Sequence, residues 1–137
     1  MRSQDEAPPR KVVLIADDEA PLRQLYARVL AREGFEVVQA ANGADALQRI
    51  EPLERVDAAL LDWKMPVMDG AALCRALRAH PRFARTPIVI ISGNIDAREA
   101  AATVGAQGAL SKPAPLGAIS AAIRSVLSAT IPAIATS

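Results

Sequence analysis

Val12-Val13-Leu14-Ile15-Ala16-Asp17-Asp18 is the stretch that decides the fold of this 137-residue chain. Its apolar residues follow one another without alternation, which is typical of a central parallel strand buried on both faces. Two carboxylates then end the run. In an open parallel α/β sheet, ligands bind outside the carboxyl ends of the strands. The stretch therefore predicts a buried strand that carries Asp17 and Asp18 to a ligand site.

Three further apolar runs end in, or just before, a residue that can bind phosphate or a hard metal ion. They are Val56–Leu61 before Asp62, Thr86–Ile91 before Ser92, and a short run near Ala109–Ser111 before Lys112. Because the carboxyl ends of parallel strands meet at one edge of a sheet, these side chains are expected to converge on one site.

The segments between the runs have the apolar spacing and the end signals of helices. The expected elements are a helix from Ala20 to a stop at Gly34, a strand over Phe35–Ala40, a helix from Asn42-Gly43 to Pro52, a helix capped by Asp69, a helix over Asp96–Val104, and a last helix from Pro115. Strand and helix alternate five times, which predicts a parallel sheet with right-handed crossovers and helices on both faces.

Composition narrows the function classes. Lys and Arg total 16 against 15 Asp and Glu, so the chain has no basic footprint for nucleic acid, and none is expected as a partner. No run has the length of a membrane span or the form of a secretory signal, so we expect a cytoplasmic protein without membrane contact. Cys74 lies at an apolar helix position and is expected to be a buried structural thiol.

Length and end composition predict one domain. We expect a disordered lead over residues 1–10, where Pro8-Pro9 opposes regular structure, a folded domain over 11–128, and a frayed tail over 129–137.

The convergent residues suggest a chemistry. Asp17, Asp18 and Asp62 form a hard oxygen site of the kind that Mg²⁺ prefers, although an Asp pair alone is as compatible with a turn or a helix cap. Lys112 beside carboxylates stays charged and can pair with a phosphoryl oxygen, and Ser92 adds a hydroxyl donor. Together these are the parts needed to form and hold an aspartyl phosphate.

Four motifs in fixed order resemble the receiver domain of two-component response regulators, the CheY-like superfamily. They are Asp17-Asp18-Glu19, the segment from Asp62 to Gly70, Ser92-Gly93 and Lys112-Pro113. The resemblance covers about Lys11 to Leu127. It implies a doubly wound (βα)5, flavodoxin-like three-layer sandwich with strand order 2-1-3-4-5.

The resemblance also implies roles for the site residues. Asp62 is the phosphoacceptor, taking its phosphoryl group from a phosphohistidine of a sensor histidine kinase or a histidine phosphotransfer protein. Asp18, Asp62 and the backbone carbonyl of Lys64 bind Mg²⁺ directly, and Asp17 binds it through water. Ser92 and Lys112 hold the phosphoryl oxygens. The output is then an interaction with a downstream protein effector, and the chain is not an enzyme beyond slow loss of its own phosphate.

The chain departs from the family at the fifth strand and the last helix. Ala109 stands where receivers usually carry Tyr or Phe, so we expect the signal to leave through Ser92–Asp96 and the helix that follows. No acid follows Glu99, which disfavours a salt-bridged dimer and predicts a monomer or weak dimer. Small residues are expected on the outer side of the last helix, either as a plain solvated face or as a docking surface: Gly117, Ala118, Ser120, Ala121 and Ser125.

Two other functions are compatible with parts of the pattern. The loss of the aromatic at Ala109 leaves open a degenerate receiver that binds partners without phosphorylation. A Mg²⁺-dependent aspartyl-phosphate phosphohydrolase is disfavoured, since such enzymes commonly place a second Asp where this chain has Lys64. The leading interpretation is a stand-alone, phosphorylatable receiver.

Overall fold

A five-stranded parallel sheet forms the centre of the computed structural model, which describes residues 9–93 and 96–129. The strands are β1 (Val12–Ala16), β2 (Glu36–Ala40), β3 (Ala58–Asp62), β4 (Ile88–Ser92) and β5 (Gly108–Ser111). Their spatial order is β2-β1-β3-β4-β5, and every neighbouring pair is parallel. The predicted flavodoxin-like strand order is therefore confirmed.

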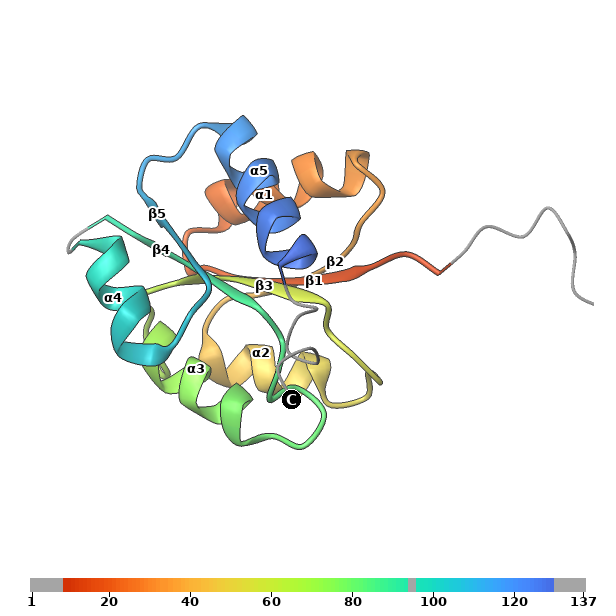
Figure 1. Cartoon of the computed structure of the whole chain (residues 1–137), viewed down its shortest axis with the longest axis vertical. Coiled ribbons are helices and arrows are strands. Elements are labelled where there is room, and N and C mark those ends of the chain that lie inside the picture. The colour runs from red at the N-terminus through yellow and green to blue at the C-terminus, as the bar shows by residue number, and fades with distance from the viewer. Residues whose placement is uncertain (1–8, 94–95, 130–137) are drawn as a thin grey trace, which may run out of the picture.

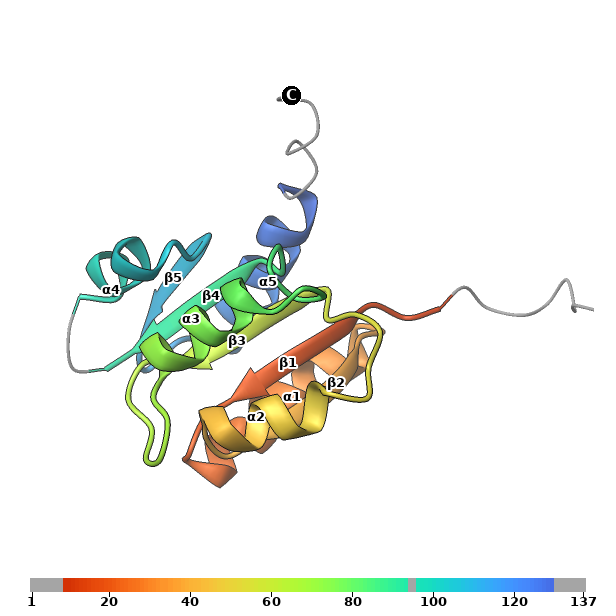
Figure 2. The same ribbon diagram turned by 90° about the horizontal axis from the view of Figure 1, so that it is seen from below.

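Helices cover both faces of the sheet, which confirms the three-layer sandwich. The helices are α1 (Ala20–Arg32), α2 (Gly43–Ile50), α3 (Gly70–Ala79), α4 (Ala97–Val104) and α5 (Leu116–Ser128). Figure 1 shows α1 and α5 on one face and α2, α3 and α4 on the other. The view in Figure 2 looks onto the second face, with α2 and α3 in front of the sheet.

The sheet separates the core into two halves. Val13 and Ile15 of β1 pack with α1 and α5, while Leu14 and Ala16 pack with α2, α3 and α4. All five residues of β1 are buried, as are all five of β3 and of β4, because helices cover both of their faces. The continuous apolar runs in the sequence follow from this arrangement.

Several helices begin where the sequence predicts. Asp69 accepts a hydrogen bond from the Ala72 N–H at 2.9 Å and so caps α3. Asp96 caps α4 in the same way through the Arg98 N–H, also at 2.9 Å. Such caps satisfy backbone donors that have no partner inside the helix. Pro115 is the residue before α5, as expected for a helix that starts there.

The third strand starts later than its apolar run suggests, at Ala58 rather than Val56. The Asp57 side chain binds the neighbouring strand β1: its Oδ2 accepts a 2.7 Å hydrogen bond from the Val12 N–H. The Arg55 guanidinium binds the same carboxylate at 3.1 Å. The Asp57 N–H also donates to the Val12 carbonyl at 2.8 Å, so side-chain bonds add to a backbone bond at this corner.

Ser120 corrects one expectation about the last helix. It does not lie on the outer side of α5 but is 8% exposed, and its hydroxyl donates to Glu33 Oε1 at the end of α1. The Arg124 Nε donates to the same oxygen at 3.0 Å. Ser120 therefore faces α1 rather than solvent.

Cys74 is fully buried in α3, and burial raises the pKa of its thiol to about 11. The expected structural thiol is confirmed. The proposed disordered lead and frayed tail fall mainly on residues 1–8 and 130–137, which lie outside the described residues. No helix in the described part of the chain is long and apolar enough to cross a membrane.

Candidate functional site

The structure brings the predicted site residues together at one edge of the sheet. Asp17 and Asp18 follow β1, Asp62 ends β3, Ser92 ends β4, and Lys112 follows β5. They surround a pocket of about 360 Å³. Its lining comprises Asp18, Glu19, Asp62, Lys64, Ser92, Gly93 and Lys112, with Asp17 buried beside it.

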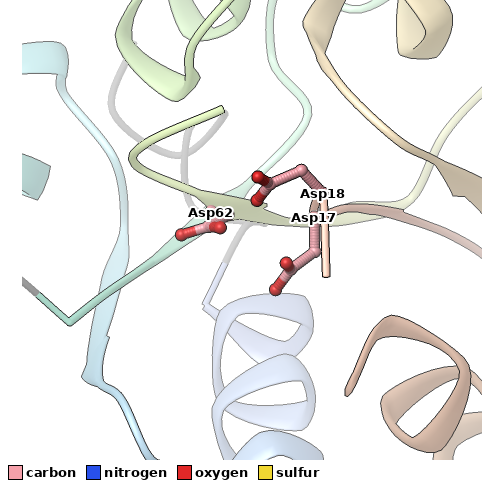
Figure 3. Close-up of side chains that lie close together, drawn as sticks. All are labelled: Asp17, Asp18 and Asp62. Atoms are coloured by element: carbon pink, nitrogen blue, oxygen red, sulfur yellow. The ribbon is translucent and has the colours of Figure 1, made fainter. Parts of the chain in front are cut away.

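Three carboxylates form the acidic part of the site. Asp17, Asp18 and Asp62 each offer an oxygen, and these oxygens lie within 4.8 Å of one another. Figure 3 shows Asp17 and Asp18 leaving the end of β1 in different directions, with Asp62 beside them. Asp17 and Asp62 are 1% and 5% exposed, whereas Asp18 is open to solvent. A buried oxygen cluster with one solvent-accessible member fits a hard cation such as Mg²⁺.

Lys112 crosses the site from the end of β5 and contacts three carboxylates. Its Nζ lies 2.8 Å from Glu19 Oε1, 3.1 Å from Asp17 Oδ2 and 3.1 Å from Asp62 Oδ2. Burial by itself would lower the pKa of Lys112, but its hydrogen bonds to Glu19 and Asp62 and its ion pair with Asp17 outweigh burial and raise the pKa. The ammonium is therefore charged at any physiological pH.

Asp62 is a carboxylate in an unfavourable environment. Burial is the main cause that raises its pKa to about 6, and the neighbouring Asp17 charge raises it further. Lys112 acts in the opposite direction without cancelling them. The site thus holds more negative charge than its single ammonium neutralises, and a divalent cation would relieve the excess.

The loop after β3 folds back tightly over Asp62. The Gly70 N–H donates to the Trp63 carbonyl at 3.0 Å, and a Cβ on Gly70 would lie 2.4 Å from the Asp62 carbonyl oxygen. Glycine is therefore required for this close approach. The turn fixes the backbone that follows Asp62, including Lys64, which is exposed and lines the pocket.

The tip of this loop adopts a rare backbone conformation. Val67 has a φ of 69° and is 84% exposed, and the Met68 N–H donates to the Pro66 carbonyl at 2.7 Å. A hydrogen bond across two residues with a positive φ between them is the strained form of the γ-turn. The Met68 carbonyl in turn accepts from the Gly43 N–H at 2.9 Å, which ties the tip to α2.

The position of the missing aromatic is partly open space. Ala109 faces a hollow of about 260 Å³ between α4 and β5. The other residues that line it are Arg98, Ala101, Ala102, Ala106, Gln107 and Gly108.

Sequence reasoning missed two residues near the site. Glu19 makes the shortest of the three Lys112 contacts, and only its place directly after the Asp pair could have indicated it. Tyr26 of α1 is 1% exposed, and its hydroxyl has no hydrogen-bond partner. The apolar spacing after Ala20 is compatible with a buried Tyr26, but it does not show where the hydroxyl lies.

Comparison with known proteins identifies the family. The model of the response regulator receiver domain matches residues 13–124. Sporulation initiation phosphotransferase F of Bacillus subtilis is 34% identical over 115 residues, which are 84% of this chain and 92% of that protein. Transcriptional regulatory protein GltR of Pseudomonas aeruginosa is 36% identical over 103 residues, 74% of this chain but 42% of that protein. The chain thus spans about half the length of several curated relatives that it matches.

Solved structures agree with the sequence relatives. A putative response regulator from Chloroflexus aurantiacus superimposes with a TM-score of 0.80 at 31% identity, covering 88% of this chain and 99% of that one. Chemotaxis protein CheY4 of Vibrio cholerae gives a TM-score of 0.80 at 30% identity, covering 87% and 100%. With this fold and a matching family model over most of its length, the chain belongs to the response regulator receiver domain family.

Proposed function

We propose that this receiver is phosphorylated on Asp62 by the phosphohistidine of a sensor histidine kinase or a histidine phosphotransfer protein. The observation that supports it best is the contact between Lys112 Nζ and Asp62 Oδ2, at 3.1 Å, beside the oxygens of Asp17 and Asp18. A nucleophile, a fixed cation and hard-metal ligands thus share one pocket. Receiver domains in general bind Mg²⁺ in such an acidic pocket and are phosphorylated by kinases.

The transfer is a displacement at phosphorus. A carboxylate oxygen of Asp62 forms the new P–O bond while the P–N bond to the donor imidazole breaks, and the bonding pair leaves with the imidazole nitrogen, which then takes a proton. Lys112 holds a phosphoryl oxygen as a fixed positive charge, and the Ser92 hydroxyl donates to another. Both residues lie at the pocket.

Mg²⁺ supplies charge neutralisation between the carboxylates and the incoming phosphoryl group. Asp18, Asp62 and the Lys64 carbonyl are the groups that would hold the ion, with Asp17 acting through water. The buried position of Asp17 and the exposure of Asp18 support this division.

The surface around the pocket supports a protein as phosphodonor. Among the described residues, the large apolar side chains that are most exposed are Leu25 at 38%, Val67 at 84% and Leu116 at 37%. They lie in α1, in the loop after β3 and at the start of α5, which are elements beside the pocket. A protein donor that reaches Asp62 would contact these elements.

Phosphorylation of the purified chain by acetyl phosphate and Mg²⁺ tests the proposal. We expect one acid-stable, base-labile phosphate per chain, seen as an added mass on the intact protein. Asp62→Asn should abolish it, and the exposed helix-cap variant Asp96→Asn should retain it. A phosphate that persists in Asp62→Asn contradicts the assignment of Asp62.

The same experiment separates the two alternatives. A binding module that works without phosphorylation would remain unlabelled, and the hollow at Ala109 is the feature that favours it. A phosphohydrolase would consume the phosphodonor continuously and in large excess over the protein. We expect slow release of one phosphate instead, since Lys64 stands where such an enzyme places a carboxylic acid.

The wider setting is also part of the proposal. We infer a stand-alone cytoplasmic regulator, monomeric or weakly dimeric, that signals to a protein effector. This chain covers 92% of sporulation initiation phosphotransferase F, which supports a receiver that acts alone. It covers only 42% of the regulator GltR, which supports a receiver that is part of a longer protein. Size measurement of the protein from its native source separates these cases.

A further inference from the structure

Tyr26 has a buried hydroxyl with no partner. The side chain is among the largest that are fully buried, at 1% exposure. In the described residues, two buried side-chain oxygens have no regular hydrogen bond: the Tyr26 hydroxyl, and Asp17 Oδ2, which has only the 3.1 Å ion pair with Lys112. Buried polar atoms almost always have such a bond, so two exceptions in one small domain require an explanation.

Both atoms belong to the same side of the sheet. Residues alternate along β1, and Ile15 packs in the core half that contains α1 and α5, so Asp17 continues on that side. Tyr26 packs in the same half. Figure 3 shows Asp17 turned away from Asp18 at the end of β1.

The position of Tyr26 in α1 favours a side chain that leans toward the site. Long side chains in a helix lean toward the helix N-terminus, and α1 begins at Ala20, two residues after Asp18. The Arg23 guanidinium also donates to the Asp17 carbonyl at 2.8 Å, which fixes α1 over the end of β1. Burial raises the pKa of the Tyr26 phenol; among the nearby charges Lys112 lowers this pKa and Asp17 raises it, which agrees with this placement.

One oxygen of the Asp17 carboxylate is bound only by Lys112. Its Oδ1 accepts from the Glu19 N–H at 2.9 Å, while Oδ2 has only the 3.1 Å ion pair with the ammonium. Lys112 has three N–H donors and already serves three carboxylates. A phosphoryl group on Asp62 adds acceptor oxygens that compete for those donors.

We propose that Tyr26 is a positioning residue for phosphoryl transfer, whose hydroxyl donates to Asp17 Oδ2, directly or through one buried water, when Lys112 turns to the phosphoryl oxygens. The bond keeps the Asp17 carboxylate in place toward the metal while its original partner is engaged elsewhere. This inference rests on the proposed function of Asp62.

Binding of Mg²⁺ with beryllofluoride, a phosphoryl mimic, to Tyr26→Phe tests the inference. Trp63 is the only tryptophan and directly follows Asp62, so its fluorescence reports binding. Loss of one hydrogen bond to a charged group should weaken beryllofluoride binding about tenfold. The unliganded variant should unfold at an equal or higher temperature, because its buried hydroxyl without a partner is gone.

A second readout follows the hydroxyl itself. Tyr26 is the only tyrosine of the chain, so a ¹³Cζ label gives a single NMR signal. We expect this signal to shift when Mg²⁺ and beryllofluoride bind, and to shift less in Asp17→Asn. Thr86→Val is the matched control, because its buried hydroxyl donates to the Val56 carbonyl at the opposite edge of the sheet. That variant should lose stability without losing affinity.

The outcomes separate the two proposals. Equal affinity of Tyr26→Phe and wild type, with an unmoved tyrosine signal, overturns the inference alone. Absence of binding by the wild-type chain overturns the proposed function and the inference together.

Discussion

Opposing electrostatic effects in the site act on one side chain, that of Asp62. Burial and the Asp17 charge raise its pKa to about 6, even with the Lys112 ammonium 3.1 Å away. At neutral pH the carboxylate is nonetheless ionised, as a nucleophile must be. The folded protein therefore holds this anion at a cost in stability, which cation binding reduces.

That cost has a predictable pH dependence in the absence of divalent ions. The folded pKa lies above the ordinary value, so the favourable contribution of Asp62 is complete below about pH 4 and is lost as the pH rises through about 6. Asp62→Asn removes the loss. We expect this variant to be more stable than wild type at pH 7 by about 1–2 kcal/mol, after allowance for solvent screening.

Urea unfolding in EDTA between pH 4 and 7.5 measures the difference. The stability gap between Asp62→Asn and wild type should close as the pH falls toward about 4. A gap that stays constant over this range would show that charge at Asp62 is not its origin.

Val67 is unfavourable for a different reason, which is its backbone conformation rather than its charge environment. A β-branched residue at a φ of 69° is unfavourable, and its side chain is 84% exposed, so little packing compensates. Val67→Gly should raise the free energy of unfolding by about 1 kcal/mol, the strain relieved less the entropy of glycine. Val67→Ala is the matched control, because it removes the side chain but retains a Cβ. If both variants gain equally in thermal unfolding, the backbone is not the cause.

Arg78 joins several elements at the edge of the sheet opposite the site. From α3 its guanidinium donates to the Thr86 carbonyl at 2.7 Å and to Gln107 Oε1 at 3.1 Å. The same Gln107 oxygen accepts the Ile88 N–H at 2.8 Å. One side chain thus links α3 to the starts of β4 and β5.

Removal of this link should destabilise the fold. Arg78→Ala leaves partly buried acceptors without donors, and we expect a loss of about 1–3 kcal/mol in chemical unfolding. Arg78→Lys should recover only part of it, because an ammonium cannot reproduce the planar fork. Arg75→Ala, at an exposed position of the same helix, should cost much less. Equal losses at the two positions would refute the role of the Arg78 bonds.

Elements with strong local signals were predictable from sequence. The apolar run Val12–Ala16 and the Asp69 cap needed only local chemistry, and both were confirmed. The convergence of Asp62 and Lys112 followed from the parallel topology. Ser120 was misplaced because its environment depends on Glu33, 87 positions away, which no helical period can reveal. The orientation of the Tyr26 hydroxyl is likewise a property of packing between distant segments.

At the scale of the whole molecule, the two ends of the parallel strands make different kinds of interaction. The site lies at the carboxyl ends, here called the site edge, and the opposite edge is the one at the amino ends. Side chains from every strand except β2 meet at the site edge, where mutual repulsion opposes tight packing. At the opposite edge, arginines bind backbone carbonyls across distant segments, such as Arg82 to Glu51 and Arg55 to Arg10. The opposite edge should therefore be the more rigid.

Amide hydrogen exchange should map this difference. We expect the slowest exchange in β1, β3 and β4, whose residues are all buried, and faster exchange in the edge strands and α4. Mg²⁺ and beryllofluoride should change protection in Ser92–Asp96 and α4, the route expected for a receiver without an aromatic at Ala109. An unchanged α4 segment in the liganded protein would exclude this route.

Because Cys74 is buried, this chain can be labelled at an introduced cysteine without interference from its own thiol. Its thiol is the only one in the sequence, is fully buried, and has a pKa of about 11, so little thiolate is present at neutral pH. A cysteine placed on the surface, for example at Val67, would then be the single reactive thiol without prior removal of the native one. With a second cysteine on α4, a pair of probes would report the distance between loop and helix in the native protein.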